Sequence, residues 1–215
     1  RRSASPASMR DGADEVCCSA MQRKTVILFA RAPRLGAVKR RLAKGIGDRA
    51  ALRFYSATLA ATARPIARDR RWRTLLATTP PGARCDWSRF VPRGTERVAQ
   101  PRGDLGARMD GAMRPYRRAV LVGSDIPGLG PADIVAAFRA LGRADAVFGP
   151  AEDGGYWLVG LGPRRPARPF AGARWSSPHA LADTLANFKG RRVALLHRRR
   201  DVDTAEDLAA IGGPR

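Results

Sequence analysis

Short apolar runs alternate with amphipathic segments along most of this chain, and this alternation constrains the fold more than any other feature. Residues 25–29 (TVILF) and 119–122 (AVLV) are continuous apolar runs, which are typical of strands buried on both faces of a parallel sheet. Between them, residues 49–67 place Leu52, Tyr55 and Leu59 at three- and four-residue steps, as on one face of a helix. The pattern predicts an α/β fold with a doubly wound, mostly parallel sheet.

The same reading gives the expected elements and domain boundaries. We expect strands over residues 25–29, 74–78, 97–100, 119–122, 146–148, 156–161 and 192–196. We expect helices over residues 38–46, 49–67, 105–116, 131–141, 178–188 and 204–211. Residues 1–22 are rich in Ser, Ala and Gly and lack periodicity, so we expect a flexible N-terminal extension followed by one domain over residues 23–215.

The chain is strongly basic, with 40 Lys and Arg against 19 Asp and Glu and a net charge of +21. Such a charge can attract nucleic acid, anionic membrane or phosphorylated substrates. The basic residues are mostly Arg in a chain rich in Ala, Gly and Pro, so codon bias in a GC-rich genome is the main source that we expect. Aromatic residues do not interleave with the basic clusters as a single-strand binder requires, and we expect no specific nucleic-acid partner.

Composition also indicates the compartment. No run approaches the roughly 18 apolar residues of a membrane span. The first residues lack the apolar region of a signal peptide. The three cysteines, Cys17, Cys18 and Cys85, form neither a disulfide framework nor a metal-binding pattern. We therefore expect no transmembrane segment and a cytoplasmic location.

Asp125 directly follows the apolar run at residues 119–122 and is followed by Ile126-Pro127. In an open α/β sheet, ligands bind at the carboxyl ends of the strands. A carboxylate at such a strand end suits a hard divalent cation such as Mg²⁺ or Mn²⁺. The alternative is that Asp125 caps the helix expected to begin near Pro131.

The first connection from strand to helix, residues 29–42, turns at Pro33 and Gly36 and enters a segment that carries Lys39 and Arg41. Helix N-terminal amides together with Arg31, Lys39 and Arg41 predict an anion site suited to a diphosphate. The segment is neither a Walker A loop nor a G-x-G-x-x-G fingerprint. The alternative is an ordinary basic helix face.

Two further turns carry acidic residues beside glycines. Asp104, in the turn 103–106, is a candidate for helix capping or for a contact to a ribose or base. Asp153, in the sequence Glu152-Asp153-Gly154-Gly155, is a candidate general base for an incoming hydroxyl. Gly154 and Gly155 allow close backbone approach to a substrate. The alternative for this segment is a tight hairpin with solvated acids.

The C-terminal third contributes an aromatic residue and a second acidic segment. Trp175 either stacks on a sugar or fills core, and His179 near a helix start is expected on the surface. Asp203 has a capping-box spacing to Glu206. If the preceding strand persists, Asp201 and Asp203 share a face that could meet Asp125 around one cation.

Taken together, the segments from Phe29 to Leu208 resemble the bacterial GT-A-type glycosyltransferase family that includes proteins assigned to arsenosugar biosynthesis, a family often known only as a domain of unknown function. Its pattern includes G-x-L-G-x-R-M, G-S-D-x-P, G-P-x-x-D-G-G-Y and D-x-D-T-x-x-D-L, which match residues 103–109, 123–127, 149–156 and 201–208. This chain departs from the pattern at three positions, with Arg31 in place of Lys, Arg40 in place of Thr, and Ser177 in place of Thr. An Arg for Lys exchange keeps the charge but changes the geometry.

The resemblance implies a nucleotide-diphospho-sugar transferase fold over residues 23–215, with a nucleotide bound by residues 31–41 and a divalent metal on Asp125. We expect a metal-dependent glycosyltransferase that moves a sugar from a nucleotide-sugar donor to a small-molecule acceptor, with Asp203 or Asp201 as a second metal ligand. The same fold also serves nucleotidyltransferases that release pyrophosphate, such as the phospholactate guanylyltransferase. The absence of a G-x-G-x-R loop after the first strand favours sugar transfer.

A third reading, a non-catalytic nucleotide or nucleic-acid binder, depends only on the charge of +21. The clustered acidic residues argue against it, because acids near the site bring nothing to a polyanion binder.

Overall fold

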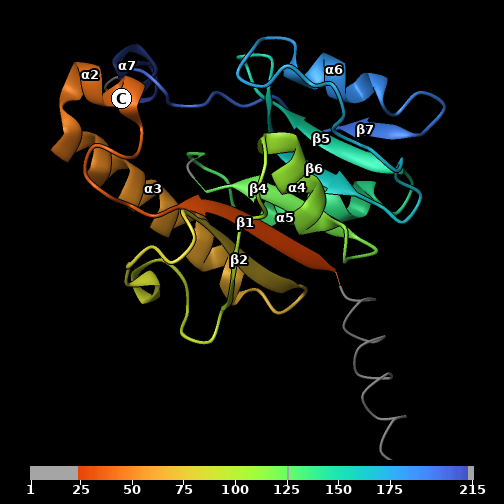
Figure 1. Cartoon of the computed structure of the whole chain (residues 1–215), viewed down its shortest axis with the longest axis horizontal. Helices are drawn as coiled ribbons and strands as arrows, with labels where there is room; N and C mark the ends of the chain where they lie inside the picture. Colours follow the sequence, from red (N-terminus) through yellow and green to blue (C-terminus); the bar gives the residue numbers. More distant parts are fainter. Residues whose placement is uncertain (1–23, 125, 213–215) are drawn as a thin grey trace, which may run out of the picture.

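A seven-stranded sheet forms the centre of the molecule (Figure 1). The computed structural model describes residues 24–124 and 126–212. The strands lie in the order β3-β2-β1-β4-β6-β5-β7. Their bounds are β1 (Thr25–Arg31), β2 (Arg73–Thr79), β3 (Glu96–Ala99), β4 (Ala119–Gly123), β5 (Ala146–Pro150), β6 (Tyr156–Leu161) and β7 (Val193–Leu195).

The mostly parallel sheet expected from the sequence is confirmed, with one reversed strand. β1 pairs in parallel with β2 and β4, β2 pairs in parallel with β3, and β5 pairs in parallel with β7. β6 is antiparallel to both β4 and β5, between which it lies. Only residues 151–155 separate β5 from β6, and a connection of that length can form a hairpin but not a parallel crossover.

Helices cover both faces of the sheet. They are α2 (Arg40–Ile46), α3 (Asp48–Arg68), α4 (Leu105–Met113), α5 (Pro131–Ala140), α6 (Ala180–Ala186) and α7 (Ala205–Gly212), with a 3₁₀ turn at Trp87–Arg89. Val26 and Leu28 of β1 pack in one core with residues of α3 and α5, whereas Ile27 packs in the other core with residues of α4. This alternation follows from the two-residue period of a strand. In Figure 1, α2 and α7 lie side by side at one end of the molecule.

Several elements are shorter than the sequence predicts. α2 begins at Arg40 and not at residue 38, because Lys39 has φ 45° and ψ 49° in the left-handed region. α4 ends at Met113, two residues before Pro115, since proline has no amide hydrogen to continue the helical hydrogen bonds. α6 begins at Ala180, after Pro178. The 3₁₀ turn was not expected.

Two expectations fall on residues that the structure does not describe. The extension over residues 1–22 and the side chain of Asp125 both lie outside the described ranges, so the role of each stays a prediction. Within the described ranges, no helix combines the length and the apolar character that crossing a membrane requires.

The β5–β6 hairpin packs tightly against the segment that leads into α6. Gly154 in the hairpin has φ +85°, and a Cβ built on it would lie 2.1 Å from the carbonyl oxygen of Pro178. The Gly154 carbonyl also accepts a hydrogen bond of 2.9 Å from the amide of Leu181. The contact requires a glycine for two separate reasons, its backbone conformation and its lack of a side chain.

We predict that Gly154→Ala lowers the free energy of unfolding by about 3 kcal/mol, because a left-handed backbone cost and an overpacking cost add together. Gly172→Ala is the matched control, since Gly172 has φ +69° with nothing within 4 Å of a built Cβ; it should cost only about 1 kcal/mol. Urea unfolding of both variants measures the difference. Equal losses would show that the Pro178 contact is not tight.

Candidate active site

Two adjoining pockets open at the carboxyl ends of β1 and β4. We call the first the basic pocket; its volume is about 430 Å³, and residues of its lining include Arg31, Lys39, Arg40, Arg41, Gln100, Arg108 and Asp203. We call the second the aromatic pocket; its volume is about 280 Å³, and residues of its lining include Met109, Asp153, Gly155, Tyr156, Trp175 and Asp201. Phe29, Leu105 and Gly123 line both pockets, so the two are halves of one cleft.

The end of β1 is fixed in place by Tyr55 of α3. The amide of Arg31 donates to the Tyr55 hydroxyl at 2.9 Å, and this hydroxyl donates to the Arg31 carbonyl at 2.8 Å. The Arg31 side chain turns back over its own loop, where Nη1 donates to the carbonyl of Ala37 at 3.2 Å. The structure therefore holds the Arg31 guanidinium at the mouth of the basic pocket.

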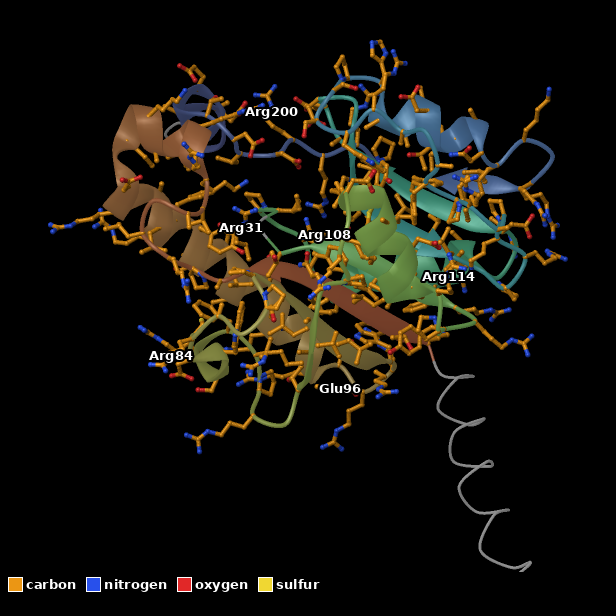
Figure 2. The ribbon with its side chains drawn as sticks, in the orientation of Figure 1. Arg31, Arg84, Glu96, Arg108, Arg114 and Arg200 are labelled. Atoms are coloured by element: carbon orange, nitrogen blue, oxygen red, sulfur yellow. The ribbon has the colours of Figure 1, made fainter. Side chains whose placement is uncertain are left out.

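A second guanidinium, that of Arg108 on α4, reaches the same pocket. The Oε1 atom of buried Gln100 accepts a hydrogen bond from Arg108, while its Nε2 donates to the Ala77 carbonyl at 2.9 Å. Burial, and after it repulsion by Arg31, lowers the pKa of Arg108. Figure 2 shows Arg31 and Arg108 near the middle of the molecule, whereas Arg84 lies at its lower left edge. An anion bound between the two guanidiniums would offset their repulsion.

Lys39 joins this pocket to the C-terminal part of the chain. Its Nζ atom donates to Oδ1 of Asp203 at 3.0 Å, and the Lys39 side chain is only 6% exposed. The two residues are 164 positions apart, so this ion pair ties the first strand-to-helix connection to the C-terminal segment, and both residues line the basic pocket.

The expected capping box of Asp203 and Glu206 is wrong, because Thr204 and Asp207 form it one position further along the chain. Oδ2 of Asp207 accepts from the amide of Thr204 at 2.9 Å, and the Thr204 hydroxyl accepts from the amide of Asp207 at 3.2 Å. This reciprocal pair is a capping box shifted along the chain. The side chain of Asp203 consequently faces Lys39 and the pocket.

The chain that carries Asp201 and Asp203 is not a strand, because β7 ends at Leu195 and only an isolated bridge joins Arg199 to Ala151. Backbone hydrogen bonds from Arg199 to Pro150 and from Glu152 to Arg199 hold this segment together with Asp133, which is buried at the start of α5. Its two carboxylate oxygens accept from Nη2 of Arg199 at 2.8 and 2.9 Å. Asp201 lines the aromatic pocket and Asp203 the basic pocket, so both face the cleft even though the expected strand does not persist.

Asp153 lies in the β5–β6 hairpin and faces the aromatic pocket. Its Oδ1 atom accepts from the amide of Gly155 at 2.9 Å, which holds the carboxylate in one orientation. Its neighbour Glu152 instead forms an ion pair of 2.7 Å with Arg200 and is not part of the pocket lining. The structure thus gives the two adjacent acids different surroundings.

Trp175 forms a wall of the aromatic pocket. Its ring meets those of Tyr156 and Phe170 at centroid distances of 6.3 and 6.5 Å. A Cβ on Gly106 would lie 2.8 Å from Cζ2 of Trp175, so α4 approaches the indole closely. Of the two readings of Trp175, packing is observed, and a face that lines the pocket is also available to a ligand.

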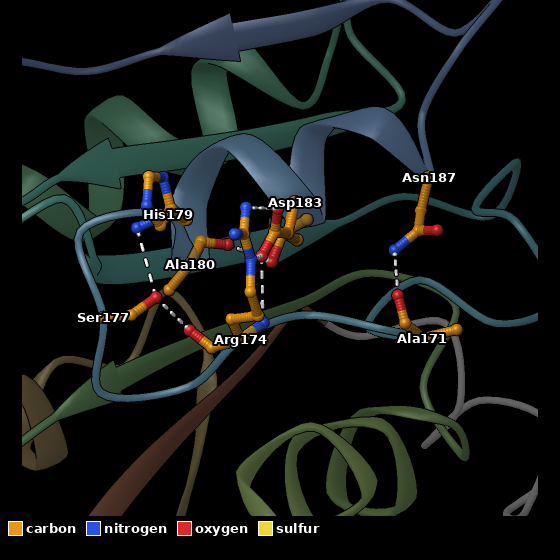
Figure 3. Close-up of polar contacts among 8 residues, drawn as sticks. Ala171, Arg174, Ser177, His179, Ala180, Asp183 and Asn187 are labelled. Atoms are coloured by element: carbon orange, nitrogen blue, oxygen red, sulfur yellow. Dashed lines mark hydrogen bonds and ion pairs between the residues drawn. The ribbon is translucent and has the colours of Figure 1, made fainter.

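A set of hydrogen bonds fastens the Trp175 segment to α6 (Figure 3). Asp183 accepts from the backbone amide of Arg174 at 3.0 Å and from its Nε atom at 2.8 Å, and these bonds lower the pKa of Asp183. The Ser177 hydroxyl donates to the Arg174 carbonyl at 2.6 Å and accepts from the amide of His179 at 3.2 Å. His179 is exposed, as expected.

Burial raises the pKa of Tyr156 well above its usual range. Its phenol therefore stays protonated and neutral at any physiological pH, and it adds no negative charge to the aromatic pocket.

Two residues expected at the site have structural contacts elsewhere. Oδ1 of Asp104 accepts from the amide of Ala107 at 2.8 Å and so caps α4. Gly154 packs on Pro178. Neither lines the basic or the aromatic pocket, and their predicted contacts to ribose and substrate stay predictions.

The carboxylates of Asp201 and Asp203 are hard oxygen donors of the kind that Mg²⁺ and Mn²⁺ prefer. Oδ1 of Asp203 is already paired with Lys39. The described residues hold no group of three His, Cys, Asp or Glu side chains that could bind a metal, and Asp125 is not among them. The metal site on Asp125 therefore stays a prediction.

Arg108 and Gln100 were not singled out from the sequence. Arg108 could have been found, because it is the one charged residue after the second glycine of the turn 103–109, at the Arg position of the family pattern. Gln100 gives no such signal, since only the fold brings it beside Arg108.

Comparison with known proteins identifies the family. Residues 62–177, more than half of the chain, match the family described as an uncharacterized protein conserved in bacteria (DUF2064). A search of curated proteins returns no significant match.

Solved structures share the fold. A protein from Desulfovibrio desulfuricans G20, provisionally named a nucleotide-diphospho-sugar transferase, is 28% identical with a TM-score of 0.78, over 89% of this chain and 87% of that one. The 4-diphosphocytidyl-2C-methyl-D-erythritol synthase of Anaerococcus prevotii is 9% identical with a TM-score of 0.52, over 88% and 96% of the two chains, and shows the fold alone. The family resemblance read from the motifs is confirmed: the chain belongs to the DUF2064 family and has the fold of the nucleotide-diphospho-sugar transferases.

Proposed function

We propose that this protein is a metal-dependent glycosyltransferase that moves a sugar from a nucleotide-sugar donor to a small-molecule acceptor. The observation that carries the proposal is the division of one cleft into a basic pocket and an aromatic pocket with carboxylates, which meet at Gly123. A nucleotide-sugar has one strongly anionic part and one neutral part, joined by the bond that breaks. The 28% identical protein provisionally named a nucleotide-diphospho-sugar transferase supports the same class of donor.

The donor diphosphate binds in the basic pocket. Arg31 and Arg108 offer planar guanidinium groups suited to phosphate oxygens, and Lys39 offers an ammonium group at the helix start. Because Lys39 is paired with Asp203, an incoming phosphate shares or replaces that partner. A divalent cation on Asp125, with Asp203 or Asp201 as a second ligand, would offset the charge of the leaving diphosphate.

The acceptor binds in the aromatic pocket with its hydroxyl toward Asp153. In the transfer step, Asp153 takes the hydroxyl proton as the acceptor oxygen bonds to the anomeric carbon. The bond from that carbon to the phosphate oxygen breaks, and the electron pair leaves with the nucleoside diphosphate. Attack from the face opposite the leaving group inverts the anomeric carbon.

The first prediction concerns the reaction type. Incubated with UDP-, GDP- or TDP-sugars and Mn²⁺ or Mg²⁺, the protein should release nucleoside diphosphate, slowly to water where no acceptor is present. Removal of the cation with a chelator should stop the release. Incubated with nucleoside triphosphates and phosphorylated acceptors, it should release no pyrophosphate, and steady pyrophosphate release would favour the nucleotidyltransferase alternative.

The second prediction concerns the basic pocket. Arg108→Gln should weaken nucleoside diphosphate binding by about tenfold or more, as expected for the loss of a charge-assisted hydrogen bond. Arg114→Gln removes the same charge at the end of the same helix, where Arg114 is exposed and paired with Asp110. Calorimetric titration with UDP and GDP should show no change for Arg114→Gln. Equal effects of the two variants would mean that net charge, and not the pocket, governs binding.

The third prediction concerns the base. Asp153→Asn should reduce turnover by roughly 10²- to 10⁴-fold, the usual contribution of general base catalysis, with donor affinity nearly unchanged. Glu152→Gln is the control and should be mild, since Glu152 is paired with Arg200 outside the pocket lining. Steady-state kinetics on donor hydrolysis separates kcat from KM. A loss confined to donor binding would assign Asp153 another role.

A further inference from the structure

The two halves of the cleft differ in charge in a way that composition does not explain. Lys and Arg make up 40 of the 215 residues. Of the described residues that line the basic pocket, five are basic: Arg31, Lys39, Arg40, Arg41 and Arg108. Of those that line the aromatic pocket, none is basic, and the charged ones are Asp153 and Asp201. In so basic a chain, a pocket lined without a cation is unsuited to an anionic ligand.

The walls of the aromatic pocket are apolar and well fixed. They include the rings of Phe29, Tyr156 and Trp175 and the side chains of Met109 and Leu158. Trp175 is held by the close approach of Gly106 and by the hydrogen bonds from neighbouring Arg174 to Asp183. Rigid aromatic walls favour a ligand with a flat or apolar body, because little side-chain entropy is lost on contact.

The two acids that line this pocket come from different segments of the chain. Asp153 comes from the β5–β6 hairpin, and Asp201 from the segment fixed by the Arg199–Asp133 ion pair. A carboxylate or phosphate on the ligand would lie near like charge, which lowers affinity, whereas an ammonium group would be attracted. The neutral Tyr156 phenol does not alter this balance.

We infer that the acceptor is a neutral or cationic small molecule with an apolar, planar body and a hydroxyl group, and that phosphorylated and carboxylated acceptors are rejected. This inference rests on the proposed function, because only a transferase has an acceptor, and it adds the chemical class of that acceptor. It is a statement about the aromatic pocket and can be tested without a donor.

Three probes that share a hydroxyphenylethyl body provide the test: tyramine, which is cationic, tyrosol, which is neutral, and 3-(4-hydroxyphenyl)propionate, which is anionic. Calorimetric or NMR titration of the whole chain, without nucleotide or added cation, gives a Kd for each. Tyramine should bind at least as tightly as tyrosol, and the propionate should bind at least about tenfold more weakly than tyrosol, because like charges lie close together. The net charge of +21 acts in the opposite sense, so a ranking set by overall charge would place the propionate first.

Two variants assign the ranking to the pocket. Asp153→Asn should reduce the ratio of the propionate Kd to the tyrosol Kd several-fold, since one of the two nearby charges is removed. Glu152→Gln removes an equal charge one residue away, but Glu152 is paired with Arg200 and does not line the pocket. This variant should leave the ratio of the two Kd values unchanged. Binding of the propionate as tight as that of tyrosol would overturn the inference, and so would an equal response to the two variants or no measurable binding of any probe.

Failure of the proposed function gives a different result. If the probes bind in the expected order but no nucleotide-sugar yields nucleoside diphosphate, the selectivity of the aromatic pocket is confirmed and the glycosyltransferase proposal is wrong. If nucleoside diphosphate is released but the anionic probe binds best, the glycosyltransferase proposal stands and the inferred acceptor class is wrong.

Discussion

The ion pair between Arg199 and Asp133 is a main contact that holds the segment carrying Asp201 and Asp203 at the cleft. Beyond the end of β7 at Leu195, the segment keeps a few backbone hydrogen bonds to β5 and to the hairpin, and Val202 is buried against α2 and α3. Asp133 accepts from Arg199 with both oxygens and also from the amide of Gly130, and these bonds attach the segment to the start of α5. Loss of one partner from such a buried pair leaves an uncompensated charge and is strongly destabilising. The positions of Asp201 and Asp203 therefore depend in part on a contact outside both pockets.

The cleft separates positive from negative charge over a short distance. The first connection after β1 and the first turn of α4 supply cations, while the β5–β6 hairpin and the segment after β7 supply carboxylates. Lys39 and Asp203 meet where the two groups adjoin. Such an arrangement suits a reaction in which negative charge develops on one side of a breaking bond and a proton leaves on the other.

The sequence was a good guide wherever the hydrophobic pattern alone determines the structure. The continuous apolar runs at residues 25–29 and 119–122 placed β1 and β4, because short runs of that kind are typical of strands buried on both faces. The start of α2 was missed because the left-handed backbone of Lys39 is a local departure that composition does not encode. The box of Thr204 and Asp207 was assigned one residue early because Asp203 and Glu206 have the same spacing. Gln100 was missed because its contact with Arg108 depends on tertiary structure.

Within the candidate site, the sequence placed Arg31, Lys39, Arg41 and Asp153 in segments that the fold brings to one cleft. This follows from a general rule, because the carboxyl ends of parallel strands share one edge of a sheet. The rule does not say which side of that edge a residue faces. The separation into two pockets of different charge is therefore visible only in three dimensions.

The shared boundary of Phe29, Leu105 and Gly123 has a consequence for how such a protein can diversify. β1, β4, the start of α4 and residues 201–203 contribute to both pockets, whereas residues 37–41 line only the basic pocket and the β5–β6 hairpin and the Trp175 segment line only the aromatic pocket. A substitution in the β5–β6 hairpin or in the Trp175 segment changes the surface that meets one ligand while leaving the cations that meet the other untouched. Selection can thus exchange one reactant while the binding of the second is preserved.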